Sequence, residues 1–270
     1  MWYKLKRIMM RPNGVEKQIR PKLTSDRPDL DRYSLLWSTT LWFTWIHGIA
    51  ISRDWTKLYA WPANWYIRQY TLTWGVLSGI SWVESETTSN IYTRWLYIKP
   101  DGSMLYSVSD NARWYNITLP TPYSLSWFSS SYTSITWIVQ NNNPVGVRFT
   151  PDWNYFYTCR NKNVHKVKVN TAWDIKTYTS TWSSSVTLSE PPNVYNVAIS
   201  PTWLKMFTWW DGDGKIYQYN LSTAWDITTA TYSWKSLSIT WRGTFSVTEN
   251  WDIFQTPTNS TGNVYQYRAS

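Results

Sequence analysis

The sequence predicts an all-β protein, and three observations support this prediction. A nine-residue anchor recurs five times, and its fifth positions are 47, 51, 50 and 48 residues apart. The segments around the anchors are rich in Val, Ile, Tyr and Thr and alternate at period two, as strands do. Pro-Asp and Asn turns separate them, and no segment reads as a helix. Because a period of about 40–50 residues with several short strands per unit is typical of propeller blades, we expect a β-propeller. The five anchors are Ile51–Tyr59, Ile98–Tyr106, Phe149–Tyr157, Ile199–Phe207 and Val247–Gln255.

The fourth copy of the repeat indicates how one blade is built. Its segments follow the order inner strand, tight turn, second strand, second turn, third strand, long loop and outer strand. In the second copy we place an outer strand at Tyr132–Val139 and a turn at Asn141–Asn143. Gly48 and Gly146 lie seven residues before the fifth anchor position, as expected where inner strands crowd around an axis. The segments of the fourth copy are Asn196–Ser200, Pro201–Trp203, Leu204–Thr208, Asp211–Gly214, Lys215–Leu221, Ser222–Tyr232 and Lys235–Thr240.

The two ends of the chain complete one blade between them. The fifth copy supplies three strands and reaches Ser270 without an outer strand, whereas Ser34–Leu41 is a strand without a blade. Joining them closes the ring and removes the free sheet edges that invite aggregation. We therefore predict a five-bladed propeller of four-stranded antiparallel blades over residues 34–270; a fragment of a larger ring is the alternative. The three strands of the fifth copy are Gly243–Thr248, Ile253–Thr256 and Asn263–Tyr267.

Residues 1–33 form a separate basic arm in this prediction. Residues 1–32 carry nine Lys or Arg against four acids, which is +5 of the chain's net charge of +9. Such an arm can contact nucleic acid or an anionic surface. A nucleic-acid role would need aromatic platforms beside the charges, and the arm offers only Trp2 and Tyr3. We favour a solvated extension, or a strand that docks on a neighbouring subunit, over nucleic-acid binding.

No membrane segment is predicted. Met1–Met10 has neither the apolar core nor the small-residue cleavage site of a signal peptide. The most apolar stretch, Leu35–Ile51, is interrupted by Ser, Thr and His47, and it only just reaches the shortest length that spans a bilayer. We read it as strand. The compartment stays open, with a virion or a cell surface among the possibilities.

The fifth anchor position is occupied by Trp four times and by Gly once. In a Pro-Asp-x turn this position favours a left-handed backbone, which costs a residue with a Cβ roughly 1–2 kcal/mol. The same exchange recurs in the second turn and in the inner strand. The composition agrees, because 23 Trp against 10 Gly inverts the usual order. The exchanged positions are Trp55, Gly102, Trp153, Trp203 and Trp251 in the anchors, Trp65 with Gly214 and Gly262 in the second turn, and Trp95 with Gly48 and Gly146 in the inner strand.

We infer that most of these tryptophans are glycine positions whose UGA codons were read as Trp, since UGA encodes glycine in some uncultured bacterial lineages. Trp173 and Trp225 are expected to be genuine, because both lie in an otherwise matching Thr-Ala-Trp-Asp-Ile loop. Their indoles should pack between blades, and the Asp should cap a local turn. The alternative is a truly Trp-rich protein that binds carbohydrate. Irregular backbone or exposed indoles at the four anchor tryptophans would support the inference, and close packing between blades would count against it.

Two runs of the fourth copy, Ser200–Phe207 and Lys215–Tyr232, resemble the repeats of bacterial and phage-encoded β-propeller proteins related to the YVTN and lactonase-like propellers. Asn263–Tyr267 matches the same strand. The resemblance covers about residues 45–270 and is closest in the fourth copy. It implies four-stranded blades but no single activity, because this fold serves many. The opening Tyr3–Pro21 is similar to leaders of phage or prophage surface proteins.

Residue types that perform catalysis are sparse. His47, just before the first inner strand, could face the central channel, whereas His165 lies in a third strand; no triad is apparent. Cys159 stands alone and should pack in a second strand, and the Asp211–Gly214 run reads as a hairpin turn better than as a calcium loop. We therefore assign no catalytic, cofactor-binding or metal-binding residue. The remaining acids are Glu84, Glu86 and Glu190 in loops or outer strands, and Asp54, Asp101 and Asp152 in the anchor turns.

Three functions remain open on this basis. The leading one is a non-enzymatic binding or structural propeller that presents rim loops to a protein or carbohydrate partner. The others are a glycosidase-like or lactonase-like hydrolase and a lectin-like carbohydrate binder. Acids or His converging on the channel within about 5–10 Å would favour the enzyme. A lining of Ser, Thr, Tyr and aliphatic side chains would favour binding.

Overall fold

The computed structural model describes most of the chain from residue 29 onward. The described residues form 20 strands and three short 3-10 helices. Of these, no helix is long and apolar enough to cross a bilayer. The described residues are 29–41, 46–62, 66–73, 76–88, 95–108, 114–126, 132–135, 145–150, 152–190, 192–200, 202–210, 212–239, 243–248, 252–257 and 262–269.

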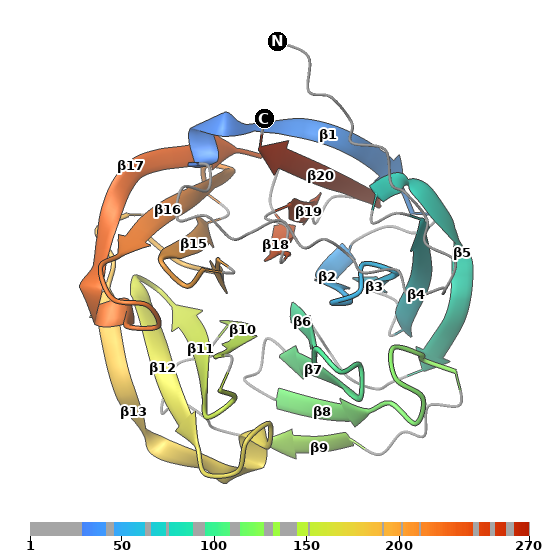
Figure 1. The fold of residues 1–270 in the computed structure, drawn as a ribbon, viewed down its shortest axis with the longest axis horizontal. Coiled ribbons are helices and arrows are strands. Elements are labelled where there is room, and N and C mark those ends of the chain that lie inside the picture. Colours follow the sequence, from blue (N-terminus) through green and yellow to red (C-terminus); the bar gives the residue numbers. More distant parts are fainter. Residues whose placement is uncertain are drawn as a thin grey trace, which may run out of the picture.

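The strands form five four-stranded sheets among the described residues, and these sheets are the blades of a closed ring (Figure 1). The first blade comprises β2 (Ile46–Ile51), β3 (Lys57–Pro62), β4 (Tyr66–Thr73) and β5 (Val76–Thr88). The second comprises β6 (Trp95–Ile98), β7 (Met104–Val108), β8 (Trp114–Thr118) and β9 (Tyr132–Ile135). The third comprises β10 (Val145–Phe149), β11 (Tyr155–Arg160), β12 (Asn163–Val169) and β13 (Tyr178–Thr187). The fourth comprises β14 (Asn196–Ile199), β15 (Lys205–Trp210), β16 (Lys215–Leu221) and β17 (Ala230–Ser238).

The fifth blade confirms the predicted closure. It contains β18 (Gly243–Val247), β19 (Ile253–Pro257) and β20 (Asn263–Ala269) from the C-terminal end, and β1 (Tyr33–Thr40) from the N-terminal end. β1 pairs antiparallel with β20 from Tyr33 opposite Ala269 to Thr40 opposite Asn263. Figure 1 shows β1 lying along the outside of β20. The five-bladed antiparallel propeller predicted from the sequence is therefore confirmed.

Burial explains why each blade has apolar inner strands and polar outer ones. The inner strands lie at the centre of the ring (Figure 1), and every residue of β6 and β14 is buried. The middle strands are covered on both faces by neighbouring blades, so Ile216 to Tyr219 of β16 are buried without interruption. The outer strand β17 is mostly exposed or half-buried. Gly146 of β10 confirms the expected crowding, because a Cβ there would lie 3.1 Å from Asn196 Oδ1 of the next inner strand.

Two boundaries in the fourth and fifth blades differ from the prediction. The outer strand β17 begins at Ala230, five residues before the predicted start, because a 3-10 turn, η3 (Ile227–Thr229), ends the loop early. In the fifth blade Val247 pairs with Ile253 six residues later, whereas Ile199 of the fourth pairs with Met206 seven residues later. The fifth anchor turn is thus one residue shorter than the repeat predicts.

The N-terminal end of the described chain repeats the loop that precedes other outer strands. η1 (Leu30–Arg32) leads directly into β1, as η2 (Ile175–Thr177) leads into β13 and η3 into β17. Each begins with an Asp followed by Leu or Ile, and that apolar residue is fully buried. The fifth blade therefore has the same order of elements as the others, although its third strand (β20) and its outer strand with the preceding turn (η1 and β1) come from opposite ends of the chain. Residues 1–28 of the predicted arm, Asn141–Asn143 and part of the Tyr132–Val139 segment lie outside the described residues.

Candidate functional site

One face of the ring carries the anchor turns, and its loops are the candidate binding surface. In each blade the anchor turn joins the inner strand to the second strand. Because the strands alternate in direction, the loop from the third strand to the outer strand returns to the same face. We call this face the anchor face. Its loops include the segments at Tyr123, Trp173 and Trp225.

The anchor acids are turn residues, as predicted. Asp101 Oδ1 accepts hydrogen bonds from the Ser103 amide (2.9 Å) and hydroxyl (2.7 Å), and Asp101 pairs with Lys99 at 2.8 Å. Partial burial raises the pKa of Asp101, but these hydrogen bonds outweigh burial and leave the pKa below its ordinary value. The equivalent amide bonds run to Asp54 from Thr56 (3.1 Å) and to Asp152 from Asn154 (3.3 Å).

The long loops are held by tyrosines of the preceding blade. The hydroxyls of three second-strand tyrosines each donate to a loop carbonyl at 2.7 Å. Burial raises the pKa of Tyr106 and Tyr157 far above the ordinary tyrosine value, so these hydroxyls stay protonated donors at neutral pH. The loops are thereby fixed to the neighbouring blade at their backbone. The pairs are Tyr59 to Tyr123, Tyr106 to Trp173 and Tyr157 to Trp225.

The Thr-Ala-Trp-Asp-Ile loops have the local structure expected for them. Asp174 and Asp226 cap η2 and η3, each accepting a 3.0 Å hydrogen bond from the backbone amide two residues on. The half-buried Trp173 ring lies 5.4 Å from Phe149 of its own blade and 6.3 Å from Tyr106 of the second blade. The predicted packing between blades is therefore observed for Trp173. Trp225 stacks on Trp203 of its own blade, with ring centroids 3.4 Å apart.

The anchor position has the predicted left-handed backbone in four blades, whichever residue occupies it. Its φ is 65° at Trp55, 72° at Gly102, 58° at Trp153 and 63° at Trp203. The unusual backbone expected at these tryptophans is therefore present. The expected exposure is not, because the three indoles are half-buried. Trp153 stacks on Trp173 of its own blade at 3.3 Å. Trp55 contacts Phe254 of the fifth blade, and this packing between blades counts against the glycine inference at position 55. Trp65 and Trp251 lie outside the described residues, and Trp95 is buried in β6.

The central channel holds two cavities. The inner one has a volume of about 20 Å³ and is lined by polar residues that include Asn196, Thr244 and Ser246, together with aliphatic side chains. The outer one has a volume of about 60 Å³ and opens among the anchor turns. Arg148 of β10 lines both cavities, and its guanidinium lies 5.2 Å from the Tyr97 ring centroid. Apart from Arg53 and Arg148, this lining is largely of the Ser, Thr, Tyr and aliphatic kind that favours binding, and its described residues include no Asp, Glu or His.

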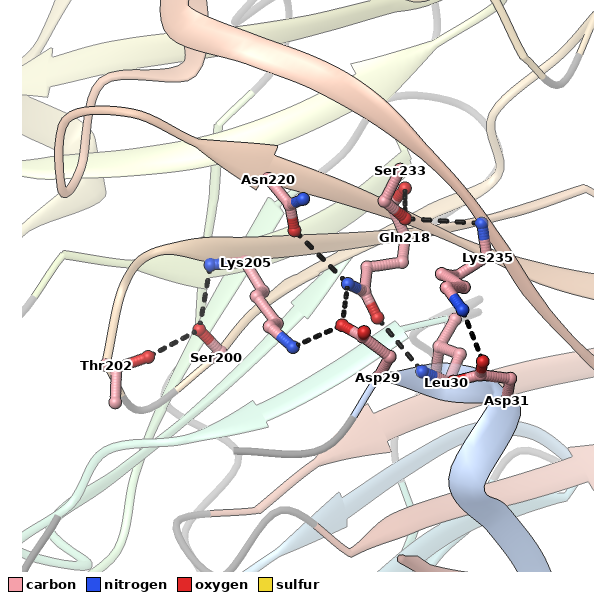
Figure 2. A network of polar contacts seen from close by, with 10 residues as sticks. All are labelled: Asp29, Leu30, Asp31, Ser200, Thr202, Lys205, Gln218, Asn220, Ser233 and Lys235. Atoms are coloured by element: carbon pink, nitrogen blue, oxygen red, sulfur yellow. Dashed lines mark hydrogen bonds and ion pairs between the residues drawn. The ribbon is translucent and has the colours of Figure 1, made fainter. Parts of the chain in front are cut away.

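The N-terminal segment is fastened to the fourth blade by a polar network, the latch (Figure 2). Asp29 accepts from Gln218 Nε2 at 2.8 Å and from Lys205 Nζ at 2.7 Å. The hydrogen bond from Gln218, and then that from Lys205, holds the pKa of Asp29 below its ordinary value. The Leu30 amide donates to Gln218 Oε1 at 3.0 Å, and Asp31 pairs with Lys235.

The latch is one instance of a contact between blades that the sequence reasoning missed. A glutamine at the fourth position of the third strand accepts a backbone amide from the next outer-strand segment in three blades. The signal was present in the Tyr-Gln-Tyr runs of β16 and β20 and in Arg-Gln-Tyr of β4. The bonds run from Leu125 to Gln69 (2.7 Å), from Leu30 to Gln218 (3.0 Å) and from Leu77 to Gln266 (3.2 Å).

The remaining candidate residues are dispersed. His47 lies inside β2 rather than before it, which corrects the prediction, and the linings of the two channel cavities do not include it. His165 is buried in β12, where burial lowers its pKa to about 4. Cys159 is buried in β11, the second strand of its blade, and burial raises its pKa. Among the described residues, no group of three or more His, Cys, Asp or Glu could hold a metal ion.

The remaining acids agree with the sequence reading. Glu84 and Glu86 lie in the outer strand β5, and Glu190 follows β13. Asp213 accepts the Lys215 amide at 3.2 Å, as a hairpin-turn residue does, and the Tyr217 hydroxyl also donates to it. Asp211 lies outside the described residues.

A solved structure with a similar fold is also a β-propeller. The chain is similar to the β-propeller domain of Cps50 (Swd1) from Myceliophteria thermophila, with a TM-score of 0.51, 9% sequence identity and 83% of each chain covered. At this identity the likeness concerns the fold alone. No protein family and no curated protein matches the sequence. The chain is therefore a β-propeller, the class that its sequence and geometry define.

Proposed function

We propose that this propeller is a non-enzymatic binding or structural protein that presents its anchor-face loops to a protein or carbohydrate partner. The observation that supports the proposal is the tyrosine contact between blades, which fixes three successive loops of one face at their backbones. Loops fixed before binding lose less conformational entropy when a partner is bound. Loops on a rigid scaffold are also where propellers and similar folds carry their binding residues.

We extend this proposal to the type of repeat and to the N-terminal arm. The Ser200–Phe207 and Lys215–Tyr232 runs support a YVTN-like repeat protein of bacterial or phage origin, part of a cell-surface or virion assembly. The basic charge of residues 1–33 supports a role for the arm in docking on a partner subunit. Neither assignment requires a catalytic residue or a cofactor.

We also propose that most Trp positions of this sequence are glycines encoded by UGA. Trp55, Trp153 and Trp203 share the left-handed backbone of Gly102, their counterpart in the second blade. Trp173 and Trp225, which we expect to be genuine, have the same backbone, so the alignment with Gly102 supports the proposal and the φ value alone does not. Trp234 adds a second kind of position, because its φ is 60° and it lies where the β16–β17 register shifts. Glycine with such a backbone is typical of β-bulges. The Trp234 side chain is 84% exposed, and its ring lies 5.1 Å from that of Tyr232 in the same strand, so burial does not explain an indole there.

A pair of charge-reversal variants tests the proposed binding face. Lys176→Glu changes an exposed residue in η2 on the anchor face, and Lys162→Glu changes an exposed residue at the β11–β12 turn on the opposite face. On an array of purified oligosaccharides and surface proteins, we expect Lys176→Glu to weaken retention and Lys162→Glu to preserve it. Equal retention by both variants would contradict the proposal. So would turnover of nitrophenyl glycosides or lactones by the unaltered protein, because it would favour the hydrolase.

A further inference from the structure

The mouth of the central channel has the features of a small anion site. The outer cavity of about 60 Å³ lies between the inner strands and anchor turns of several blades. Its lining includes two arginines, Arg53 and Arg148, and three hydroxyl residues, Ser52, Ser246 and Thr248. The described residues that line it include neither Asp nor Glu. The Ser52 hydroxyl donates to Asp54 at 2.6 Å and the Thr248 hydroxyl to the Asp252 carbonyl at 3.2 Å, so the two guanidinium groups are the principal donors of this lining. Guanidinium groups bind oxyanions through charge-assisted hydrogen bonds.

Arg148 is the central element of this site. It is the charged residue that lines both the outer and the inner cavity. Its Nε atom is buried and has no hydrogen-bond acceptor among the described residues. The Tyr97 ring, 5.2 Å from the guanidinium carbon, supports the group by a cation–π contact but supplies no acceptor in the guanidinium plane. A buried donor of this kind is left for water or for a ligand oxygen.

The volume of the cavity limits what can enter it. One water molecule needs roughly 10–15 Å³ of such space. A cavity of about 60 Å³ therefore accommodates a carboxylate or a tetrahedral oxyanion, but not a sugar ring. The rest of a larger ligand would have to remain outside, among the anchor turns.

Other charges near the mouth belong to the turns. Asp54 follows Arg53, and its carboxylate accepts from the Ser52 hydroxyl at 2.6 Å and from the Thr56 amide at 3.1 Å. This acid lowers the positive potential on the Arg53 side of the mouth. The principal contact is therefore assigned to Arg148, which lies on the inner strand β10 rather than in a turn.

We propose that the channel mouth binds a small oxyanion, the carboxylate, sulfate or phosphate group of a ligand, with Arg148 as its principal contact. The inference goes beyond the proposed function, because an anion can occupy the mouth whether or not the loops hold a macromolecular partner. It can fail while the loop proposal holds, and the reverse is also true.

Isothermal titration calorimetry at low ionic strength tests the proposal with four probes: acetate, glucuronate, sulfate and phosphate. We expect one-to-one binding of at least one probe, weaker as NaCl is added, and at least tenfold weaker in Arg148→Gln. The matched control is Arg160→Gln, which removes the same charge at the end of β11 from a residue that lines neither channel cavity. The probe that binds most tightly distinguishes a carboxylate from a sulfate or phosphate source.

Two results would overturn the proposal: no saturable binding of any probe, or equal losses in Arg148→Gln and Arg160→Gln. If Arg148→Gln does not fold, Arg148→Lys decides, because lysine keeps the charge but loses the planar fork. At least threefold weaker binding by Arg148→Lys supports the site, and unchanged binding contradicts it.

Discussion

The anchor turn of the second blade has the same backbone conformation as those of the third and fourth blades but is formed by different residues. In the second blade the Tyr123 amide donates to the Gly102 carbonyl at 2.9 Å. The equivalent bonds from Trp173 to Trp153 and from Trp225 to Trp203 are 3.3 and 3.4 Å long. A Cβ added to Gly102 would lie 2.5 Å from the Tyr123 ring, a distance that real Cβ atoms do not show.

The difference indicates what the turn requires. The φ values of the three turns lie between 58° and 72°, so the turn fixes the backbone whatever the residue. With glycine the loop aromatic packs directly on the turn. With tryptophan the loop is held by a longer hydrogen bond, and two indoles stack instead. The left-handed backbone of the anchor position favours glycine. The loop position has a similar backbone, with φ of 62° at Tyr123, 69° at Trp173 and 70° at Trp225, but holds an aromatic residue in all three blades.

Gly102→Trp should have the largest effect on this comparison. The left-handed backbone costs a residue with a Cβ roughly 1–2 kcal/mol, and overpacking against Tyr123 adds about 1–3 kcal/mol. We expect a loss of about 2–5 kcal/mol in the free energy of unfolding, measured by urea titration. Gly214→Ala is the control, because its φ is also positive but the nearest atom to an added Cβ is 3.3 Å away. Equal losses for the two variants would show that crowding by Tyr123 plays no part.

Removing the two stacked indoles of the fourth blade one at a time should change the free energy of unfolding in opposite directions. Trp225→Gly removes a half-buried loop indole at a cost of about 2–3 kcal/mol, of which relief of its own left-handed backbone (φ 70°) offsets about 1 kcal/mol. Trp203→Gly relieves the left-handed backbone and should be neutral or stabilising by up to about 1 kcal/mol. Thermal and urea unfolding measure both. A larger loss for Trp203→Gly than for Trp225→Gly would break the comparison.

The tyrosine hydroxyls should matter more where the turn bond is longer. Tyr106→Phe removes the bond to the Trp173 loop, and Tyr59→Phe removes the bond to the Tyr123 loop. A neutral hydrogen bond contributes about 0.5–1.5 kcal/mol. We expect Tyr106→Phe near the upper end and Tyr59→Phe near the lower end, with faster amide exchange in the affected loop. The reverse order would mean that the turn bond does not hold the loop.

Removing the latch at the ring closure should have the smallest effect on the free energy of unfolding. Asp29→Asn should cost up to about 1 kcal/mol, since its ion pair with Lys205 is partly exposed. The pKa of Asp29 is lowered in the folded protein, so its contribution is complete above the unfolded pKa and is lost as pH falls through the folded value. The stability difference between variant and unaltered protein should therefore vanish in acid. A difference that persists at low pH would assign the effect to packing.

The fold could be predicted from the sequence because the same strand pattern recurs five times. Little of the candidate site could be predicted in this way. Five anchors, one strand without a blade near the N-terminal end and one blade without an outer strand at the C-terminal end were enough to predict the ring and its closure. The shorter fifth turn was hidden, because Trp251 aligns with the other anchor tryptophans until Val247 is seen to pair with Ile253. The equivalence of η1 with η2 and η3 was not predicted, because the segments share only an Asp followed by a buried aliphatic residue. Arg148 could not be singled out, since which inner-strand residues face the channel depends on the register of β10.

The most direct test of the central claim, that the anchor position holds glycine and the loop position holds tryptophan, is peptide sequencing by tandem mass spectrometry. Protein purified from the cells that carry the gene would be cleaved with trypsin into peptides that include Thr177–Lys205 and Ile216–Lys235. We predict glycine at position 203 and tryptophan at position 225. Tryptophan at both positions would contradict the account.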